Sequence, residues 1–80
     1  MMLGIVVGKV WSTKKAEPLT GQPLLLVSPQ SRSGPPIVAV DCVGAGEGET
    51  VLVTSGGGAR VAAGGGLPID AAIVGIIDNQ

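Results

Sequence analysis

From Ile37 to Thr54 the sequence reads IVAVDCVGAGEGETVLVT, two apolar runs on either side of a glycine-rich segment. Apolar, mostly β-branched residues at its two ends favour extended strands, which we predict at Ile37–Val43 and Thr50–Thr54. Between them, glycine occupies every second position of Gly44-Ala45-Gly46-Glu47-Gly48. Because glycine adopts positive φ angles without steric cost, this segment predicts a tight turn between two strands.

The same glycines superficially resemble a phosphate-binding loop. A Walker-type loop needs a lysine, a following helix and a surrounding βαβ unit. Here Gly48 is followed by Glu49 and then by the strand-like residues Val51-Leu52-Val53. The sequence therefore favours a turn over a nucleotide-binding site.

Three further apolar runs have the same character, and glycines and prolines separate all five. They are Leu3–Trp11, Leu24–Val27 and Ala71–Ile77. Pro23 and Pro29 flank the second of these runs and exclude a long helix there. Five short strands separated by turn signals predict an all-β fold, either a small barrel or a sandwich.

Glycines within and between the runs add detail to this prediction. Gly4, Gly8 and Gly75 lie inside strand-like segments, where they predict bulges or corners of a closed sheet. The connection Gly56–Ile69 contains two runs of three glycines around Ala59–Ala63. Alanine and arginine are good helix formers, so we expect one short helical turn there. With no internal repeat and no linker, residues 1–80 are predicted to form a single domain.

The composition points to a small domain that needs partners. Of its 80 residues 45% are hydrophobic, yet Trp11 is the only aromatic residue. Aromatic side chains bury the most area per residue, so the interior of this chain is expected to be thin. Cys42 is the only cysteine and there is no histidine, which leaves no intrachain disulfide and suggests no metal site. Oligomerisation is the remaining way to support so small a fold.

Charge and hydropathy exclude several classes of partner. The net charge is −1, which predicts no attraction to nucleic acid or to anionic lipid. The longest uncharged stretch, Pro18–Ser31, contains three prolines and is too short and too polar to cross a membrane. The first residues lack the basic flank and long apolar run of a signal peptide. We therefore expect a cytoplasmic protein without a membrane partner.

The sequence offers little for catalysis. Side-chain catalysis needs a positioned acid, base or nucleophile with a partner, and histidine and tyrosine are both absent. Glu47 and Glu49 would lie on one side of an extended loop, but two solvated glutamates are the commoner outcome. Cys42 lies in an apolar run beside Asp41, whose carboxylate raises the pKa of a thiol, so we expect a small buried hydrophobe. Neither an enzyme nor a cofactor is predicted.

Arg60 is the most informative charge because it stands alone among glycines and alanines. It is either a solvated surface arginine or a contact at a subunit boundary or symmetry axis. Composition by itself favours the solvated arginine, since most arginines are exposed.

Several motifs together resemble one known family along the whole chain. The N-terminal segment follows a Leu-Gly-x-Val-x-Gly-x-Val-Trp-x-Thr-Lys-Lys pattern from Leu3 to Lys15. Asp-x-Val-Gly-Ala-Gly-x-Gly-Glu-x-Val-Leu runs from Asp41 to Leu52, and Gly-x-x-Ala-Arg follows at Gly56–Arg60. The chain then continues through Pro68–Asp78. This combination resembles the EutN/CcmL family of bacterial microcompartment vertex proteins.

The resemblance implies a five-stranded OB-like β-barrel that assembles into pentamers. Such pentamers sit at the corners of polyhedral shells whose facets are hexameric and trimeric tiles, inside the cytoplasm. The resemblance also implies site residues. Those near the five-fold axis and its narrow pore would be Gly56, Gly57, Gly58, Ala59 and Arg60. Those of a turn near the subunit contact would be Asp41, Gly44, Ala45, Gly46, Glu47 and Gly48.

Two functions of other classes compete with this interpretation. An OB-like barrel can bind single-stranded nucleic acid, but such domains use aromatic stacking platforms and a basic groove. One tryptophan and five basic residues in a chain of net negative charge disfavour that role. The other alternative, a small enzyme or cofactor carrier, would depend on Asp41, Cys42 or Glu47.

Overall fold

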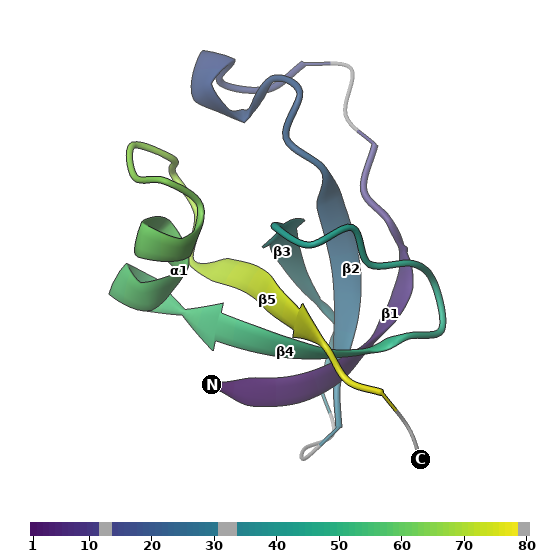
Figure 1. Ribbon diagram of the computed structural model, residues 1–80. Helices are drawn as coiled ribbons and strands as arrows, with labels where there is room; N and C mark the ends of the chain where they lie inside the picture. The colour runs from purple at the N-terminus through teal and green to yellow at the C-terminus, as the bar shows by residue number, and fades with distance from the viewer. Residues whose placement is uncertain (12–13, 31–33, 79–80) are drawn as a thin grey trace.

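The computed structural model describes residues 1–11, 14–30 and 34–78, and five strands dominate it (Figure 1). The elements in chain order are β1 (Met2–Lys9), the 3-10 helix η1 (Glu17–Leu19), β2 (Leu24–Pro29), β3 (Ile37–Asp41), β4 (Thr50–Ser55), α1 (Gly56–Ala62) and β5 (Ala71–Ile76). The strands close into a barrel in the order β1-β2-β3-β5-β4. This confirms the all-β, five-stranded barrel with one short helix.

All neighbouring strands run antiparallel except β3 and β5, which are parallel. The parallel contact is short and pairs only Val40 with Ala72 and Asp41 with Ile73. Figure 1 shows β4 and β5 side by side, with α1 beyond the end of β4, and the loop that carries η1 leads into the start of β2. The barrel is thus closed by its shortest strand pairing.

Side chains alternate between the interior and the outside along β1 and β2. On β1, Gly4 and Val6 are buried while Leu3 and Ile5 are exposed. On β2, Leu25 and Val27 are buried and their neighbours are only half-buried. This period of two is what a strand with one covered face requires.

The glycines inside strands have different roles. Gly8 borders a register shift between β1 and β2, and Gly75 lies opposite Leu52, where the pairing of β4 with β5 shifts. These two confirm the expected irregularities. Gly4 borders no shift in the described pairings; a side chain there would collide with Val27 and the backbone of Ser28, so glycine is needed for close packing of β1 on β2.

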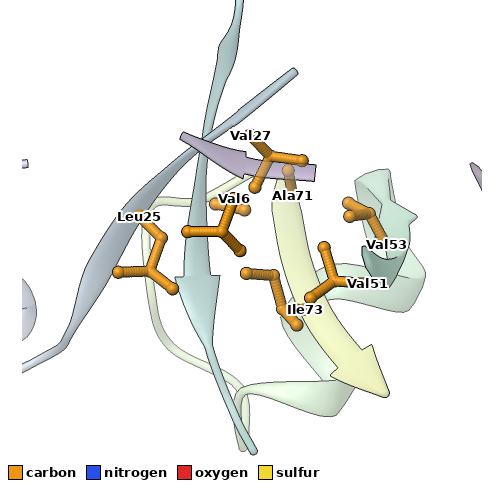
Figure 2. Packing of buried hydrophobic residues seen from close by; sticks show 8 residues of the cluster. Val6, Leu25, Val27, Val51, Val53, Ala71 and Ile73 are labelled. Carbon is orange, nitrogen blue, oxygen red and sulfur yellow. The ribbon is translucent and has the colours of Figure 1, made fainter. Parts of the chain in front are cut away.

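The interior is filled by aliphatic side chains from every strand (Figure 2). Its buried members are Val6, Leu25, Val27, Ala39, Val51, Val53, Ala71 and Ile73. Burying each valine or isoleucine is worth about 1.5–3 kcal/mol, and no aromatic ring contributes among these residues. A second, smaller cluster lies outside the barrel, where Ala59 of α1 packs on Val40 and Ala72. The prediction of a thin core is confirmed.

Several predicted boundaries differ from the structure. β1 ends at Lys9 rather than Trp11, and β3 ends at Asp41 rather than Val43. Helix α1 begins at Gly56, three residues before the expected Ala59, so the glycine triplet forms its first turn. The N–H of Gly56 donates to the Asp70 carbonyl at 2.9 Å, and this tertiary bond fixes the start of the helix. The sequence did not predict η1, and Ser12 and Thr13 of the N-terminal pattern lie outside the described residues.

Candidate functional site

The turn after β3 is organised by one carboxylate. The Asp41 oxygens accept hydrogen bonds from three successive N–H groups, those of Val43 (3.1 Å), Gly44 (3.1 Å) and Ala45 (2.8 Å). Gly44 and Gly48 have φ angles of +82° and +87°, which confirms the predicted positive φ. The predicted tight turn was wrong, because residues 42–49 form a longer connection between β3 and β4, which are not neighbours in the barrel. Asp41 is half-buried, and its charge is committed to the turn rather than offered to a substrate.

The turn is also fastened to β1. The N–H of Gly48 donates to the Val6 carbonyl at 2.8 Å, and the Val6 N–H donates to the Glu49 carbonyl at 3.0 Å. The Glu49 side chain accepts the Gly46 N–H at 2.6 Å, and both Glu47 and Glu49 are exposed. Their exposure fits solvated loop residues rather than a catalytic pair.

The prediction that Cys42 is buried was wrong, because the structure places it on the surface and not in the interior. Side chains alternate along β3, so Cys42, the residue after Asp41, falls on the same side as Val40, which packs against α1 outside the barrel rather than in its interior. Its Sγ lies 3.8 Å from the Ala62 carbonyl oxygen. Partial burial raises the pKa of the thiol, and the Asp41 charge raises that pKa further, so the thiolate is disfavoured.

The segment Gly56–Arg60 forms most of α1 and is exposed along much of its length. Gly57, Gly58 and Arg60 are exposed, whereas Ala59 is buried against the barrel. The Arg60 guanidinium donates to the Ile69 carbonyl at 3.1 Å and so ties the helix to the loop that follows it. The five predicted axis residues thus share one surface helix, whereas the predicted contact turn lies elsewhere, between β3 and β4.

A hollow of about 280 Å³ opens at the end of the barrel near Trp11. Lys9, Trp11, Lys15 and Asp41 are among its lining residues. The Lys9 ammonium lies 6.0 Å from the centre of the Trp11 ring, whose side chain is 84% exposed. The described residues that line the hollow do not pair a nucleophile with a free base, because the Asp41 carboxylate already accepts the N–H groups of the turn.

Sequence reasoning missed the apolar residues on the outside of the barrel. Leu3 and Ile5 on β1 and Val38 on β3 are each between 37% and 45% exposed. Both sides of β1 are apolar, so hydrophobicity alone does not tell which side faces the interior. The sequence did carry a signal, because every position of Leu3–Val7 is apolar. A strand with one face exposed to solvent would instead alternate apolar and polar residues.

Within the described part of the chain, His, Cys, Asp and Glu side chains form no group of three that could hold a metal ion. Over the same residues, no helix has the length and apolar character needed to span a bilayer.

The fold and the site define a small closed β-barrel whose distinctive features are turns, a short surface helix and apolar outer faces. The family described as "Ethanolamine utilisation protein EutN/carboxysome" matches residues 1–78. The chain belongs to this EutN/CcmL family, as the sequence motifs predicted.

Individual relatives agree with this assignment. The microcompartment shell vertex protein GrpN of Rhodospirillum rubrum is 47% identical, with 99% of this chain and 94% of that protein aligned. The carboxysome shell vertex protein CcmL of a Synechocystis species is 49% identical, over 99% of this chain and 84% of CcmL. The solved structure of GrpN, described as a pentameric microcompartment shell protein, superposes with a TM-score of 0.87 at 46% identity and covers 99% and 95% of the two chains. These relatives do not favour the nucleic-acid-binding alternative.

Proposed function

We propose that this chain forms homopentamers that close the five-fold vertices of a bacterial microcompartment shell. The observation that carries the proposal is the match to GrpN, a pentameric shell protein, at 46% identity and a TM-score of 0.87 over nearly the whole of both chains. A thin aliphatic core and apolar residues on the outer surface also suit a protein that is completed by copies of itself.

Geometry gives the reason for a pentamer. Hexagonal tiles alone pave a flat layer, and five-fold positions are needed to close that layer into a shell. In this role, function depends on symmetry and on edges rather than on a pocket. The proposal therefore includes hexameric and trimeric shell proteins as partners, a location in the cytoplasm within the shell, and no catalytic activity or nucleic-acid partner.

The proposal assigns two regions to the assembly. Gly56, Gly57, Gly58, Ala59 and Arg60 would frame the opening on the five-fold axis, and their position on an exposed surface helix supports this. The turn that contains Asp41, Gly44, Ala45, Gly46, Glu47 and Gly48 would lie near the subunit contact. Its internal hydrogen bonds support a rigid rather than adaptable contact.

The first test is the native mass of the purified chain. A pentamer of the 7.8 kDa protomer has five times that mass, 39 kDa, and we expect this species by native mass spectrometry at micromolar concentration. A stable monomer under these conditions would overturn the pentamer. Co-expression with hexameric shell tiles tests the vertex role, because closed particles should require this chain and open sheets or tubes should form without it.

A further inference from the structure

The hollow near Trp11 is built by three segments that lie far apart in the sequence. It forms where β1 ends, where β2 begins and where β3 ends. Two backbone hydrogen bonds fasten these segments to one another. The Val10 N–H donates to the Leu24 carbonyl at 2.9 Å, and the Asp41 N–H donates to the Pro23 carbonyl at 2.9 Å. The walls of the hollow are therefore held in place by the fold of a single chain.

The only aromatic side chain of the protein lines this hollow instead of the barrel interior. Trp11 is 84% exposed, although an aromatic ring is among the side chains that gain most from burial. Apolar residues, among them Pro23 and Leu24, line the hollow beside it. An exposed indole next to an apolar wall is a surface on which the planar ring of a ligand can stack.

Two lysines give the hollow a positive charge that the protein as a whole lacks. The chain has a net charge of −1, yet both Lys9 and Lys15 line this one hollow. The Lys9 ammonium lies 6.0 Å from the centre of the Trp11 ring, so a cation and an aromatic ring occur together. Asp41 is the acidic residue among the described lining residues, and its oxygens already accept three N–H groups of the turn. The lining therefore favours an anion.

These groups narrow the class of ligand. An ammonium group binds an anion as a point charge, and two of them match a phosphate monoester, which carries about two negative charges at neutral pH. The hollow of about 280 Å³ lies near the lower end of the roughly 300–1,000 Å³ that small-molecule sites occupy. Its size thus suits a small ligand rather than a folded partner.

We propose that this hollow binds a planar ring that carries one phosphate group, in the size class of a mononucleotide. The ring would stack on Trp11, and the phosphate would contact the ammonium groups of Lys9 and Lys15. One aromatic ring and two cations serve one such unit, whereas a nucleic-acid strand needs several rings along a basic groove. The inference goes beyond the vertex function and does not depend on it, because all the lining residues belong to one chain.

The single tryptophan makes the site directly observable. Because Trp11 is the only tryptophan, its fluorescence reports a base that stacks on it. Adenosine monophosphate should quench this fluorescence saturably at concentrations up to about 10 mM, with N-acetyltryptophanamide titrated in parallel to correct for absorption and collisional quenching. Adenosine, which lacks the phosphate, should bind more weakly, and so should inorganic phosphate, measured by displacement of adenosine monophosphate. Added salt should weaken binding of the monophosphate more than that of adenosine.

Variants then test the individual side chains by calorimetry. Lys9→Gln and Lys15→Gln should each raise the dissociation constant of adenosine monophosphate about two- to fivefold and leave that of adenosine nearly unchanged. Trp11→Ala should raise both constants by at least about fivefold, because the stacking surface is lost. All three side chains are exposed, so the barrel interior is not altered. Arg60→Gln is the charge-matched control, since Arg60 lies on α1 and does not line the hollow.

Several results would overturn the inference. One is the absence of saturable quenching of the unmodified chain up to about 10 mM adenosine monophosphate. Equal affinities for adenosine and its monophosphate would show that the lysines take no part, and equal affinities for the monophosphate and inorganic phosphate would show that the ring takes no part. Equal weakening by Arg60→Gln and Lys15→Gln would indicate a general effect of charge and not a site.

Two further measurements keep these results distinct from folding and from assembly. Circular dichroism checks that each variant retains the native barrel. Native mass, measured in the same buffer, shows whether the chain is pentameric, so a failure of the proposed function is distinguished from a failure to bind adenosine monophosphate.

Discussion

The two glycine-rich segments of the chain both reverse its direction, and they do so by different means. In Gly44–Gly48, a single Asp41 carboxylate collects three N–H groups, and positive φ is confined to Gly44 and Gly48. In Gly56–Gly66, backbone hydrogen bonds dominate, and three consecutive glycines, from Gly64 to Gly66, have φ between +75° and +93°. The first segment depends on side-chain carboxylates, chiefly that of Asp41 with Glu49 beside it, whereas the second depends on the conformational freedom of its backbone.

This difference predicts where single substitutions have large effects. Removing Asp41 should release the first part of the turn, because no other side chain accepts the N–H groups of Val43 and Gly44 in the described structure. The bonds that join Gly46 to Glu49 and Gly48 to Val6 would remain. In the helix segment, removing a side chain should matter less than adding one.

Asp41→Ala should lower the free energy of unfolding by about 2–3 kcal/mol, because three charge-assisted hydrogen bonds are lost from a half-buried site. Asp41→Asn keeps one carbonyl oxygen as acceptor and should cost roughly half as much. Urea denaturation at one fixed protein concentration measures both effects, since assembly would add to apparent stability. Asp78→Asn, at an exposed carboxylate near the end of β5, is the control. If Asp41→Ala unfolded at the same urea midpoint as the unmodified chain, the role given to this carboxylate would be refuted.

Gly44→Ala should cost about 1–2 kcal/mol, the penalty for a side chain in the left-handed region, although nothing lies within 4 Å of its position. Gly46→Ala in the same turn should have a much smaller effect. Gly46 has no positive φ, and its new Cβ would lie 3.4 Å from the Glu49 carboxylate. Thermal unfolding of the two variants side by side separates conformational strain from crowding. Equal destabilisation would show that crowding, and not φ, sets the cost.

Gly57 and Gly58 in α1 should respond to alanine in opposite directions. Gly57→Ala adds a methyl group in open space and should stabilise the chain by about 0.5–1 kcal/mol, because alanine favours the helix. Gly58→Ala places its Cβ 2.7 Å from the Thr54 hydroxyl and should instead destabilise the chain by about 1 kcal/mol. If Thr54 is first changed to alanine, Gly58→Ala should cost less. This smaller cost is measured by comparing the double variant with Thr54→Ala alone. Stabilisation by Gly58→Ala without that second change would contradict the close helix–strand contact.

Cys42 should show no large stability effect but a distinct reactivity. Only the thiolate is alkylated, and the raised pKa of Cys42 means less thiolate in the native chain than in the unfolded chain at the same pH. Iodoacetamide at pH 8 should therefore modify the native chain more slowly than the urea-unfolded chain, and the native rate should climb as pH approaches and passes 9.0, the ordinary value. The same shift lowers native stability slightly above that pH, because the unfolded chain then releases the thiol proton more readily. Faster alkylation of the native chain would contradict the assigned direction.

Local sequence was enough for most of the fold. The five strands, the positive φ angles of Gly44 and Gly48 and the presence of a short helix followed from β-branched runs, alternate glycines and an alanine-rich segment. These features depend on near neighbours in the chain, for which propensity and φ preference are sufficient. Family motifs then identified the EutN/CcmL family, which the matched relatives confirm.

Other features depended on contacts between distant residues. Cys42 is exposed because it falls on the outer side of the barrel, towards the end of α1, and α1 begins at Gly56 because the Asp70 carbonyl, fourteen positions further on, accepts its N–H. Local propensity places the helix start later, since three glycines are poor helix formers. The side of β1 that meets the interior was likewise undecided, because Leu3–Val7 is apolar on both sides.

The order of the five strands and of the short helix between the last two thus follows from local conformational preference. Which apolar side chains fill the barrel and which remain outside follows from long-range contacts. That choice depends on the closure of five strands through the short β3–β5 pairing, which joins residues about thirty positions apart. Leu3, Ile5 and Val38 are among the apolar residues that the closed barrel leaves exposed.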